Sequence, residues 1–329
     1  MKPSRRHLLR LAAGVAALAG LRSIGQAQPY PSRPVVIIVP VPPGGVADPI
    51  ARILADHLTA TLGQPVVIEN VTGAGGSIGV ARLARAAPDG YTLGIGNWLS
   101  HVGASAIYPV QYDVVEDLAP ISLLTRSPIL ITARKDFPAK DLNELIAWLK
   151  ANPGKATVAT VGRGSAGHVS SFYFGRETGT RFEFVPYRGG GPAIQDELAG
   201  HVDLMFNEGT GALPYVLSGQ IRVYAVLAKQ RWFAAPNIPA IAELGISGIE
   251  ISFWHGLWAP KGTPQEIVSR LDAAVVDALG DATVRERLTA IGQEIFPRAE
   301  QTPQALRAFH QAEIEKWWPI IKAAGTGVE

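Results

Sequence analysis

The chain of 329 residues contains no cysteine, which excludes disulfides, thiolate metal sites, a cysteine nucleophile and a lipidated N-terminal cysteine. Charged side chains are also sparse, at 18% of residues, and no run of lysine or arginine marks a surface for nucleic acid or anionic lipid. We therefore expect neither a nucleic acid nor an anionic membrane as a partner. Apolar residues make up 47% of the chain, which is typical of globular proteins, and the length predicts two domains or one large one.

The first 27 residues have the layout of an export signal. A basic start precedes an apolar stretch from Leu11 to Leu21, and Gly25-Gln26-Ala27 forms a small-x-small cleavage site. The segment Ser4-Arg5-Arg6-His7-Leu8-Leu9 matches a twin-arginine signal, and an ordinary secretory signal is the alternative. The mature chain is predicted to begin near Gln28, outside the cytoplasm. Five of the 30 lysines and arginines lie in this segment, so the mature chain has 25 basic and 28 acidic side chains.

Strands and helices alternate in the first hundred residues. The β-branched run Val35–Val39 predicts a strand buried on both faces of a parallel sheet. Asp48 is predicted to cap a following helix, and Gly63 to end it. A second strand is predicted at 66–68, followed by a glycine-rich loop at 73–77 in which Ser77 caps the next helix. That helix runs up to 87, and a third strand covers 91–95.

The same strand-loop-helix unit recurs in the middle of the chain, where a strand at 157–161 leads into Gly162–Gly167 and a helix. We therefore predict an α/β fold of two domains, each a mostly parallel sheet flanked by helices. The predicted first domain comprises 28–127 plus 231–329, and the second 128–230. Two chain crossings between the domains form a hinge, and the ligand crevice lies at the carboxyl ends of the strands.

Two motifs suggest enzymes. The glycines in Gly162-x-Gly164-x-x-Gly167, with Glu183 about twenty residues further on, formally match a dinucleotide fingerprint, which keeps open an exported nicotinamide-dependent oxidoreductase. The segment Gly75-Gly76-Ser77-Ile78-Gly79 spells the G-x-S-x-G of hydrolases. Loop residues separate that serine from its strand, so a helix cap explains the pattern more simply, and an esterase is a third possibility. The histidines show no metal-ligand spacing, and no metal is predicted.

Small-residue loops precede four predicted helices, at Pro42–Asp48, Gly73–Ser77, Arg163–Ala166 and Gly189–Pro192. Free N–H groups and the helix dipole make such loops suitable for anions, and glycine lets a ligand approach the backbone. Tight turns between strands and helices are the alternative explanation for each loop. Two such loops on opposing domains would hold a carboxylate without a catalytic group, which suits a receptor better than an enzyme.

Several motifs resemble the extracytoplasmic solute receptors of tripartite tricarboxylate transporters, the Bug family. The resemblance covers essentially the whole mature chain. The motifs that carry it are Pro40-Val41-Pro42-Pro43-Gly44-Gly45, Gln64-Pro65-Val66-Val67-Ile68-Glu69-Asn70, Gly73-Ala74-Gly75-Gly76, Ala87-Pro88-Asp89-Gly90-Tyr91-Thr92-Leu93, Val185-Pro186-Tyr187-Arg188-Gly189-Gly190, Trp254-x-Gly256-Leu257 and Ala259-Pro260-x-Gly262-Thr263-Pro264.

This resemblance implies a periplasmic, non-enzymatic binding protein of the hinged two-domain type. It implies capture of a small mono- or dicarboxylate without a cofactor, and delivery to the membrane subunits of a transporter; we expect a monomer. Loops that hold one carboxylate in the family correspond to Pro42–Asp48 and Gly162–Ser165. The predicted ligand-binding residues are Pro42, Pro43, Gly44, Gly45, Val46, Ala47, Asp48, Ser100, His101, Arg163, Gly164, Ser165, Ala166, His168, Arg188, Asn207 and Glu208.

The chain departs from the family pattern at one strand end. The usual Phe-Asp-Asn is Phe206-Asn207-Glu208 here, so the aspartate that pairs with an ammonium group in amino-acid-binding members is missing, although Glu208 could compensate. Arg163 stands where the family usually has an uncharged polar residue. A guanidinium there could pair with a second carboxylate, or lie solvated at the mouth of the cleft.

Overall fold

The computed structural model describes residues 30–246 and 248–323, and the predicted export signal lies outside them. From Arg33 onward the chain forms one compact unit of mixed α/β structure. In the described residues, no helix has the length and apolar character needed to cross a membrane.

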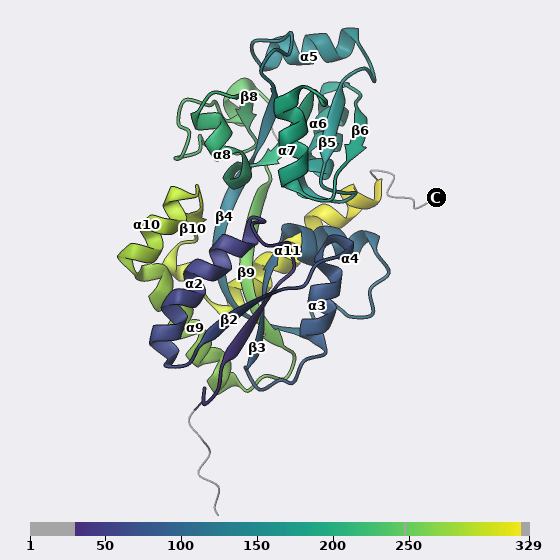
Figure 1. The fold of residues 1–329 in the computed structure, drawn as a ribbon. Coiled ribbons are helices and arrows are strands. Elements are labelled where there is room, and N and C mark those ends of the chain that lie inside the picture. Colours follow the sequence, from purple (N-terminus) through teal and green to yellow (C-terminus); the bar gives the residue numbers. More distant parts are fainter. Residues whose placement is uncertain (1–29, 247, 324–329) are drawn as a thin grey trace, which may run out of the picture. The chain divides into compact units, whose positions relative to one another are not determined.

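Ten strands form a continuous curled sheet in two sections (Figure 1). In the first section β1 pairs in parallel with β2 and β3, and β9 pairs antiparallel with β3 and β4. In the second section β5 pairs in parallel with β6 and β7, while β7 and β8 run antiparallel to β4. The strands are β1 (Val35–Val39), β2 (Val66–Asn70), β3 (Thr92–Asn97), β4 (Leu118–Arg134), β5 (Thr157–Thr160), β6 (Glu183–Pro186), β7 (Leu204–Glu208), β8 (Ile221–Val226), β9 (Ser252–Pro260) and β10 (Glu294–Ile295).

Strand β4 belongs to both sections. Its pairing with β9 ends at Pro128, and its pairing with β7 begins at Ile129. Proline has no N–H to donate to a ladder, so Pro128 suits the position where β4 changes partners. The predicted boundary between the two domains, at 127/128, falls at this change, and the division into domains stays a prediction.

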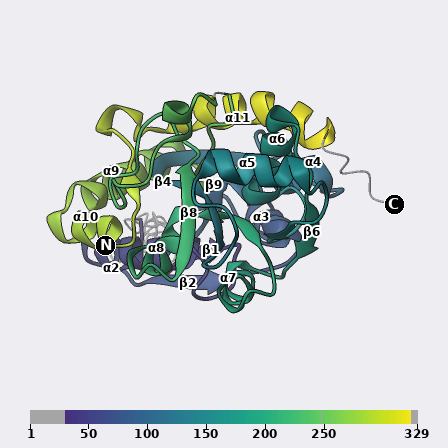
Figure 2. The same ribbon diagram turned by 90° about the horizontal axis from the view of Figure 1, so that it is seen from above.

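Helices cover both faces of the sheet. In the first section α11 packs on β4, and Figure 2 shows α2 and α11 on opposite sides of β4 and β9. In the second section α6 and α7 both pack on β7. The helices are α2 (Ala47–Leu62), α3 (Ser77–Ala84), α4 (Ala104–Ile107), α5 (Leu142–Ala151), α6 (Ala166–Thr178), α7 (Gly190–Ala199), α8 (Gly209–Leu217), α9 (Gln265–Gly280), α10 (Ala282–Ala290) and α11 (Pro303–Ala323), with short helical turns η2 (Ala74–Gly76), η3 (Leu99–Gly103), η4 (Ile241–Leu244) and η5 (Arg298–Glu300).

Local signals predicted the ends of α2 only in part. Gly63 ends the helix in the left-handed conformation, with φ 70°, as predicted. The prediction that Asp48 caps the helix is wrong, because α2 already begins at Ala47 and the Asp48 carboxylate binds Gly44, Arg52 and Asn70 instead. Ser77 is likewise the first residue of α3 rather than its cap, which is Gly76.

A buried tryptophan cluster fastens the last helix to the first section of the sheet. Trp98, Trp254 and Trp317 are at most 1% exposed and pack in the core. The indole of Trp254 donates to Oε2 of Glu313 in α11 at 3.0 Å. Burial raises the pKa of Glu313, and the hydrogen bond from Trp254 opposes this effect. The cluster therefore combines apolar packing with a hydrogen-bonded, partly buried acid.

A second buried acid lies under the other section. The Glu197 side chain in α7 is fully buried, and Oε1 accepts a hydrogen bond from Oγ1 of Thr132 at 2.7 Å. Oε2 is buried and has no hydrogen-bond partner in the described part of the chain. Burial raises the pKa of Glu197 to about 8, against the weaker effect of Thr132, so the folded chain holds this side chain neutral at pH 7.

We predict that Glu197→Gln stabilises the fold at neutral pH. A raised pKa in the folded state means that the wild type has its full stability below the unfolded value near 4.5 and loses stability as pH rises toward about 8. The variant should gain on the order of 3 kcal/mol at pH 7 and nothing near pH 4. Urea unfolding across pH 4–8 measures this gain, with exposed Glu183→Gln as the control. Equal pH dependence in wild type and Glu197→Gln would contradict the neutral state.

Candidate functional site

The loop between β1 and α2 is held in shape by Asp48. The buried Asp48 carboxylate accepts hydrogen bonds from the Gly44 amide, the Arg52 guanidinium and the Asn70 amide, each at 3.0 Å. Burial opposes ionisation of Asp48, but these bonds outweigh it and keep its pKa below the usual value. The carboxylate is therefore occupied within the loop, and residues 42–46 offer no polar side chain.

The loop between β5 and α6 contains two glycines with positive φ, Gly162 at 109° and Gly164 at 70°. Ser165 caps α6, because its hydroxyl accepts from the His168 amide at 3.2 Å. The Gly164 amide donates to Nδ1 of His168 at 3.2 Å, so Nδ1 is an acceptor. Burial, with a smaller effect of the Arg163 charge, lowers the pKa of His168 to about 4, and the ring is neutral at pH 7.

Close contacts at glycines show that this loop packs against the first section of the sheet. A Cβ on Gly103 would overlap the carbonyl oxygen of Gly164, and a Cβ on Gly164 would overlap the side chain of Ile107. On the other side of the loop, a Cβ on Gly167 would overlap the carbonyl oxygen of Phe206 in β7. The predicted loop at 162–166 therefore lies between the η3–α4 segment and the end of β7.

Ser100 and His101 lie in η3, next to the end of β1. A Cβ on Gly76 would come within 3.0 Å of both Pro40 and Ser100. Ser100 and His101 are each 1% exposed, and the His101 ring stacks on Trp258 at 4.1 Å between centroids. Its Nε2 is buried and has no partner in residues 30–246 and 248–323. Burial holds the pKa of His101 well below its usual value, helped by His310. The structure thus places His101 in the core beside the loops, and its ligand contact stays a prediction.

The end of β7 carries Asn207 and Glu208 on opposite faces. Asn207 is 4% exposed, and its Nδ2 is buried without a partner among the residues that the structure describes. Glu208 is partly buried, and Oε1 accepts a hydrogen bond from Oγ of Ser127 in β4 at 3.1 Å. Burial raises the pKa of Glu208 well above its usual value, and the hydrogen bond from Ser127 opposes this with a smaller effect.

Three polar residues near this strand end were not among the predicted site residues. Thr125 and Ser127 in β4 are buried, and His255 in β9 is fully buried with Nδ1 at 3.4 Å from Oγ1 of Thr125. Nε2 of His255 has no partner within the described chain. Burial lowers the pKa of His255 to about 3. Hydroxyl residues two positions apart in a mostly apolar run were the available sequence signal, because they share one face of a strand.

The remaining predicted site residues are two exposed arginines, Arg163 after β5 and Arg188 between β6 and α7. The glycines that follow Arg188 begin α7 at Gly190. Both guanidiniums therefore lie in loops that leave the carboxyl ends of parallel strands, where α/β sheets bind ligands. No group of three or more histidine or acidic side chains suited to a metal ion occurs in the described residues.

The dinucleotide interpretation of the Gly162 loop fails on strand register. Glu183 pairs with Thr157 at the start of β5, whereas the glycine loop follows the end of that strand. An acid that binds a ribose must lie at the carboxyl end of its strand, near the loop. Glu183 is exposed at the opposite end and cannot take that role.

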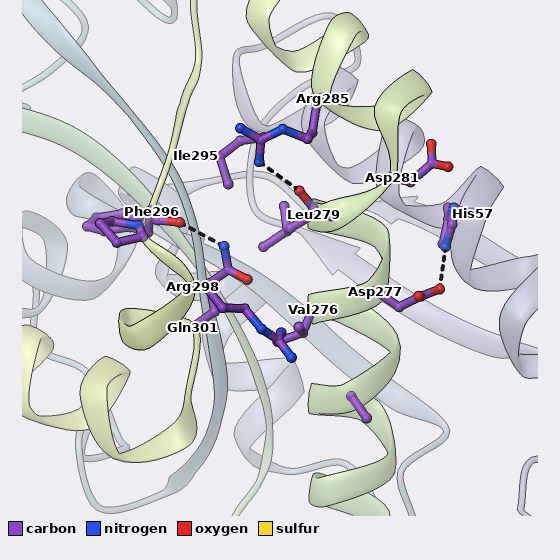
Figure 3. A pocket seen from close by; sticks show the side chains of 13 residues that line it. His57, Val276, Asp277, Leu279, Asp281, Arg285, Ile295, Phe296, Arg298 and Gln301 are labelled. Carbon is purple, nitrogen blue, oxygen red and sulfur yellow. Dashed lines mark hydrogen bonds and ion pairs between the residues drawn. The ribbon is translucent and has the colours of Figure 1, made fainter.

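A pocket of about 790 Å³ lies elsewhere, among α2, α9, α10 and η5 (Figure 3). Its polar groups largely bind one another: His57 pairs with Asp277 at 2.9 Å, and Arg285 donates to the Leu279 carbonyl at 3.2 Å. Gln301 donates to the Phe296 carbonyl at 2.7 Å. None of the predicted site residues lines this pocket.

Comparisons with known proteins identify relatives over almost the whole chain. Residues 50–326 match the family model described as tripartite tricarboxylate transporter family receptor. BugT of Bordetella pertussis is 36% identical over 311 residues, 94% of either chain. The structure of MatC from Rhodopseudomonas palustris with bound malate is 38% identical, with a TM-score of 0.82 over 89% of this chain and all of that one. An R. palustris structure with adipate is 33% identical, with a TM-score of 0.84 over 90% of this chain and 98% of that one.

We predict that Gly164→Ala loosens the contact between the 162–166 loop and the η3–α4 segment. The added Cβ would overlap Ile107, and φ of 70° strains any L side chain. Gly162→Ala is the matched control, because it also has positive φ but no atom lies within 4 Å of its Cβ. Hydrogen exchange should become faster over 99–108 in Gly164→Ala only. Equal exchange in both variants would show that the contact does not protect this segment.

Proposed function

Because this chain belongs to the family of tripartite tricarboxylate transporter receptors, we propose that it captures a small organic mono- or dicarboxylate and delivers it to the membrane subunits of such a transporter. The observation that carries the proposal is that two solved structures similar over nearly their full length hold malate and adipate. Both ligands are aliphatic dicarboxylates. The family resemblance and the α/β binding-protein fold predicted from the sequence are confirmed.

The proposed site lies where the loops after β1, β3, β5, β6 and β7 meet. The amides of Gly44, Gly45, Gly164 and Ser165 donate within the chain. Among the described residues of the two loops, the amides of Val46 and Gly162 would hold one carboxylate, because backbone N–H groups at helix starts favour anions. Arg163 and Arg188 are proposed to attract and pair with a second carboxylate. The proposed site also includes Ser100 and His101 from the segment after β3, and Asn207 and Glu208 at the end of β7.

Ligand capture in this proposal requires binding and no chemical step. A micromolar dissociation constant corresponds to about −8 kcal/mol. A few charge-assisted hydrogen bonds, at roughly 1.5 to 3 kcal/mol each, reach that value after the costs of association. We therefore propose a receptor rather than an oxidoreductase or an esterase, and Ser77 supports the latter poorly because it is buried at the start of α3.

We further propose that capture closes a hinge between domain one, 28–127 plus 231–329, and domain two, 128–230. Strand β4 provides one crossing, at Ser127–Ile129, where its pairing changes from β9 to β7. The chain returns through the segment between β8 and β9. Export by the twin-arginine signal, a periplasmic location and a monomeric state belong to the same proposal.

Thermal unfolding with candidate ligands tests the receptor function. Malate and adipate, at about 100 times their dissociation constants, should stabilise the mature chain by about 2.7 kcal/mol and raise its melting temperature by several degrees. Their dimethyl esters are matched controls that keep the carbon skeleton and lack the charges. The panel also contains monocarboxylates, aromatic acids, amino acids and nicotinamide dinucleotides.

A shift with one class of carboxylate and none with its esters would support the receptor and identify the ligand class. A shift with dinucleotides alone would overturn the proposal in favour of the oxidoreductase. Adding bulk at Gly164 should abolish binding and leave the fold intact, whereas the same ligand-induced shift in wild type and Gly164→Ala would remove this loop from the site.

A further inference from the structure

We propose that Glu208 binds as a neutral acid that donates its proton in a hydrogen bond to a carboxylate of the ligand, which makes carboxylate capture dependent on pH. This inference rests on the proposed receptor function and deepens it, because it concerns how the same site selects its ligand. It assigns to Glu208 a role as a specificity-determining residue that an amide side chain could mimic and an ionised carboxylate could not.

The geometry leaves one oxygen of Glu208 for a ligand. Oε1 accepts from Ser127 at 3.1 Å, whereas Oε2 has no partner in the described part of the chain and the side chain is only partly buried. Glu208 shares a face of β7 with Phe206, whose ring packs against Phe174 of α6 at 5.5 Å between centroids. The carboxyl is therefore on the side of β7 that carries the 162–166 loop.

No cation neutralises this carboxyl from β4 or from the strand beyond it. In β4, Arg126 binds Glu294 and Arg134 binds Asp203 and Asp136. In β9, His255 is buried and neutral at pH 7, since burial lowers its pKa to about 3.

The other elements packed on β7 supply no cation either. Strand β5 and helix α8 contain no charged residue. On α6, His168 is neutral and bound to Gly164, and the exposed Arg176 is paired with Glu177. The acids of α7 bind elsewhere, Glu197 to Thr132 and Asp196 to Tyr187 and His201. Arg163, in the loop before α6, acts on His168.

Burial without a cation favours the protonated form, and it raises the pKa of Glu208 well above the usual value. A protonated carboxyl has one O–H donor, and Ser127 leaves that donor unused because it donates to Oε1 itself. A ligand carboxylate accepts such a donor strongly, in a hydrogen bond to a charged acceptor. When Glu208 ionises, it loses the donor and repels the ligand.

The sign of the pH dependence follows from this. Affinity is complete while Glu208 of the free receptor is protonated, and it falls up to tenfold per pH unit above the pKa of that group. Binding above this pKa takes up one proton. An aspartate-like ionised partner for an ammonium ligand would show the opposite trend.

Isothermal titration of the mature wild-type chain with malate and adipate, from pH 5.5 to 9, tests the inference. Two buffers of different ionisation enthalpy count the protons taken up. Wild type should lose affinity as pH rises, and Glu208→Gln should lose this pH dependence because the amide keeps a donor that does not titrate.

Glu197→Gln is the matched control, since Glu197 is also a buried acid with a raised pKa but lies beside Thr132, outside the site. It should titrate malate and adipate as wild type does. Ser127→Ala gives a second, independent variant. It removes the bond that favours the ionised form, so the pH at which affinity begins to fall should move upward.

The outcomes separate this inference from the receptor function. Ligand binding by wild type with no pH dependence, or with the same dependence in Glu208→Gln, would overturn the role of Glu208 and leave the receptor intact. Failure of folded wild type to bind any carboxylate of the thermal panel would overturn both. Unchanged pH dependence in Ser127→Ala would also count against the inference, even where Glu208→Gln fails to fold.

Discussion

The structure depends on one shared strand. Strand β4 hydrogen-bonds with β9 up to Pro128 and with β7 from Ile129, so a single stretch of backbone holds both sections of the sheet. A relative rotation of the sections must bend β4 near this point, because elsewhere its N–H and C=O groups are tied into ladders. A bend there moves the β7 end and the 162–166 loop together, since Phe206 contacts Gly167.

The same crossing concentrates buried polar groups. Thr125 and Ser127 supply hydroxyls from β4, His255 approaches from β9 and Glu208 from β7. Burying polar atoms is costly unless they are hydrogen-bonded, yet His255 keeps an unpartnered nitrogen here, and Asn207 keeps another on the opposite face of β7. Unpaired groups at the ends of strands, where loops of both sections meet, are consistent with a site that completes its hydrogen bonds with a ligand.

Much of the fold could be predicted because its signals are local. The β-branched run Val35–Val39 and the stop at Gly63 are read from neighbouring residues, and both are confirmed. The predicted helix caps at Asp48 and Ser77 were wrong. Asp48 binds tertiary partners such as Asn70 instead, and the left-handed Gly76 takes the cap position before Ser77. The 17-residue strand β4 was not foreseen, since its two sets of partners lie far away in sequence.

In the candidate site, too, local features could be predicted from the sequence and contacts between distant residues could not. Glycine loops before helices could be found from sequence, because φ and the need for free amides select glycine. The sequence could not show that Ser127 binds Glu208, 81 residues further on, nor that His101 packs between Trp258 and His310. Those relations arise from strand register and helix packing.

The Asp48 hydrogen bonds separate two functions within the proposed site, namely binding a carboxylate and selecting among acids. Gly44, Arg52 and Asn70 already satisfy this carboxylate, so the shape of the loop before α2 does not depend on a ligand. In the proposed site, this loop would contact the ligand through backbone that side-chain substitution scarcely alters. That loop would act as a general carboxylate-binding element. Redesign of the receptor for a longer or differently charged acid would then leave residues 42–48 untouched and vary Arg163, Arg188 and the Asn207-Glu208 pair.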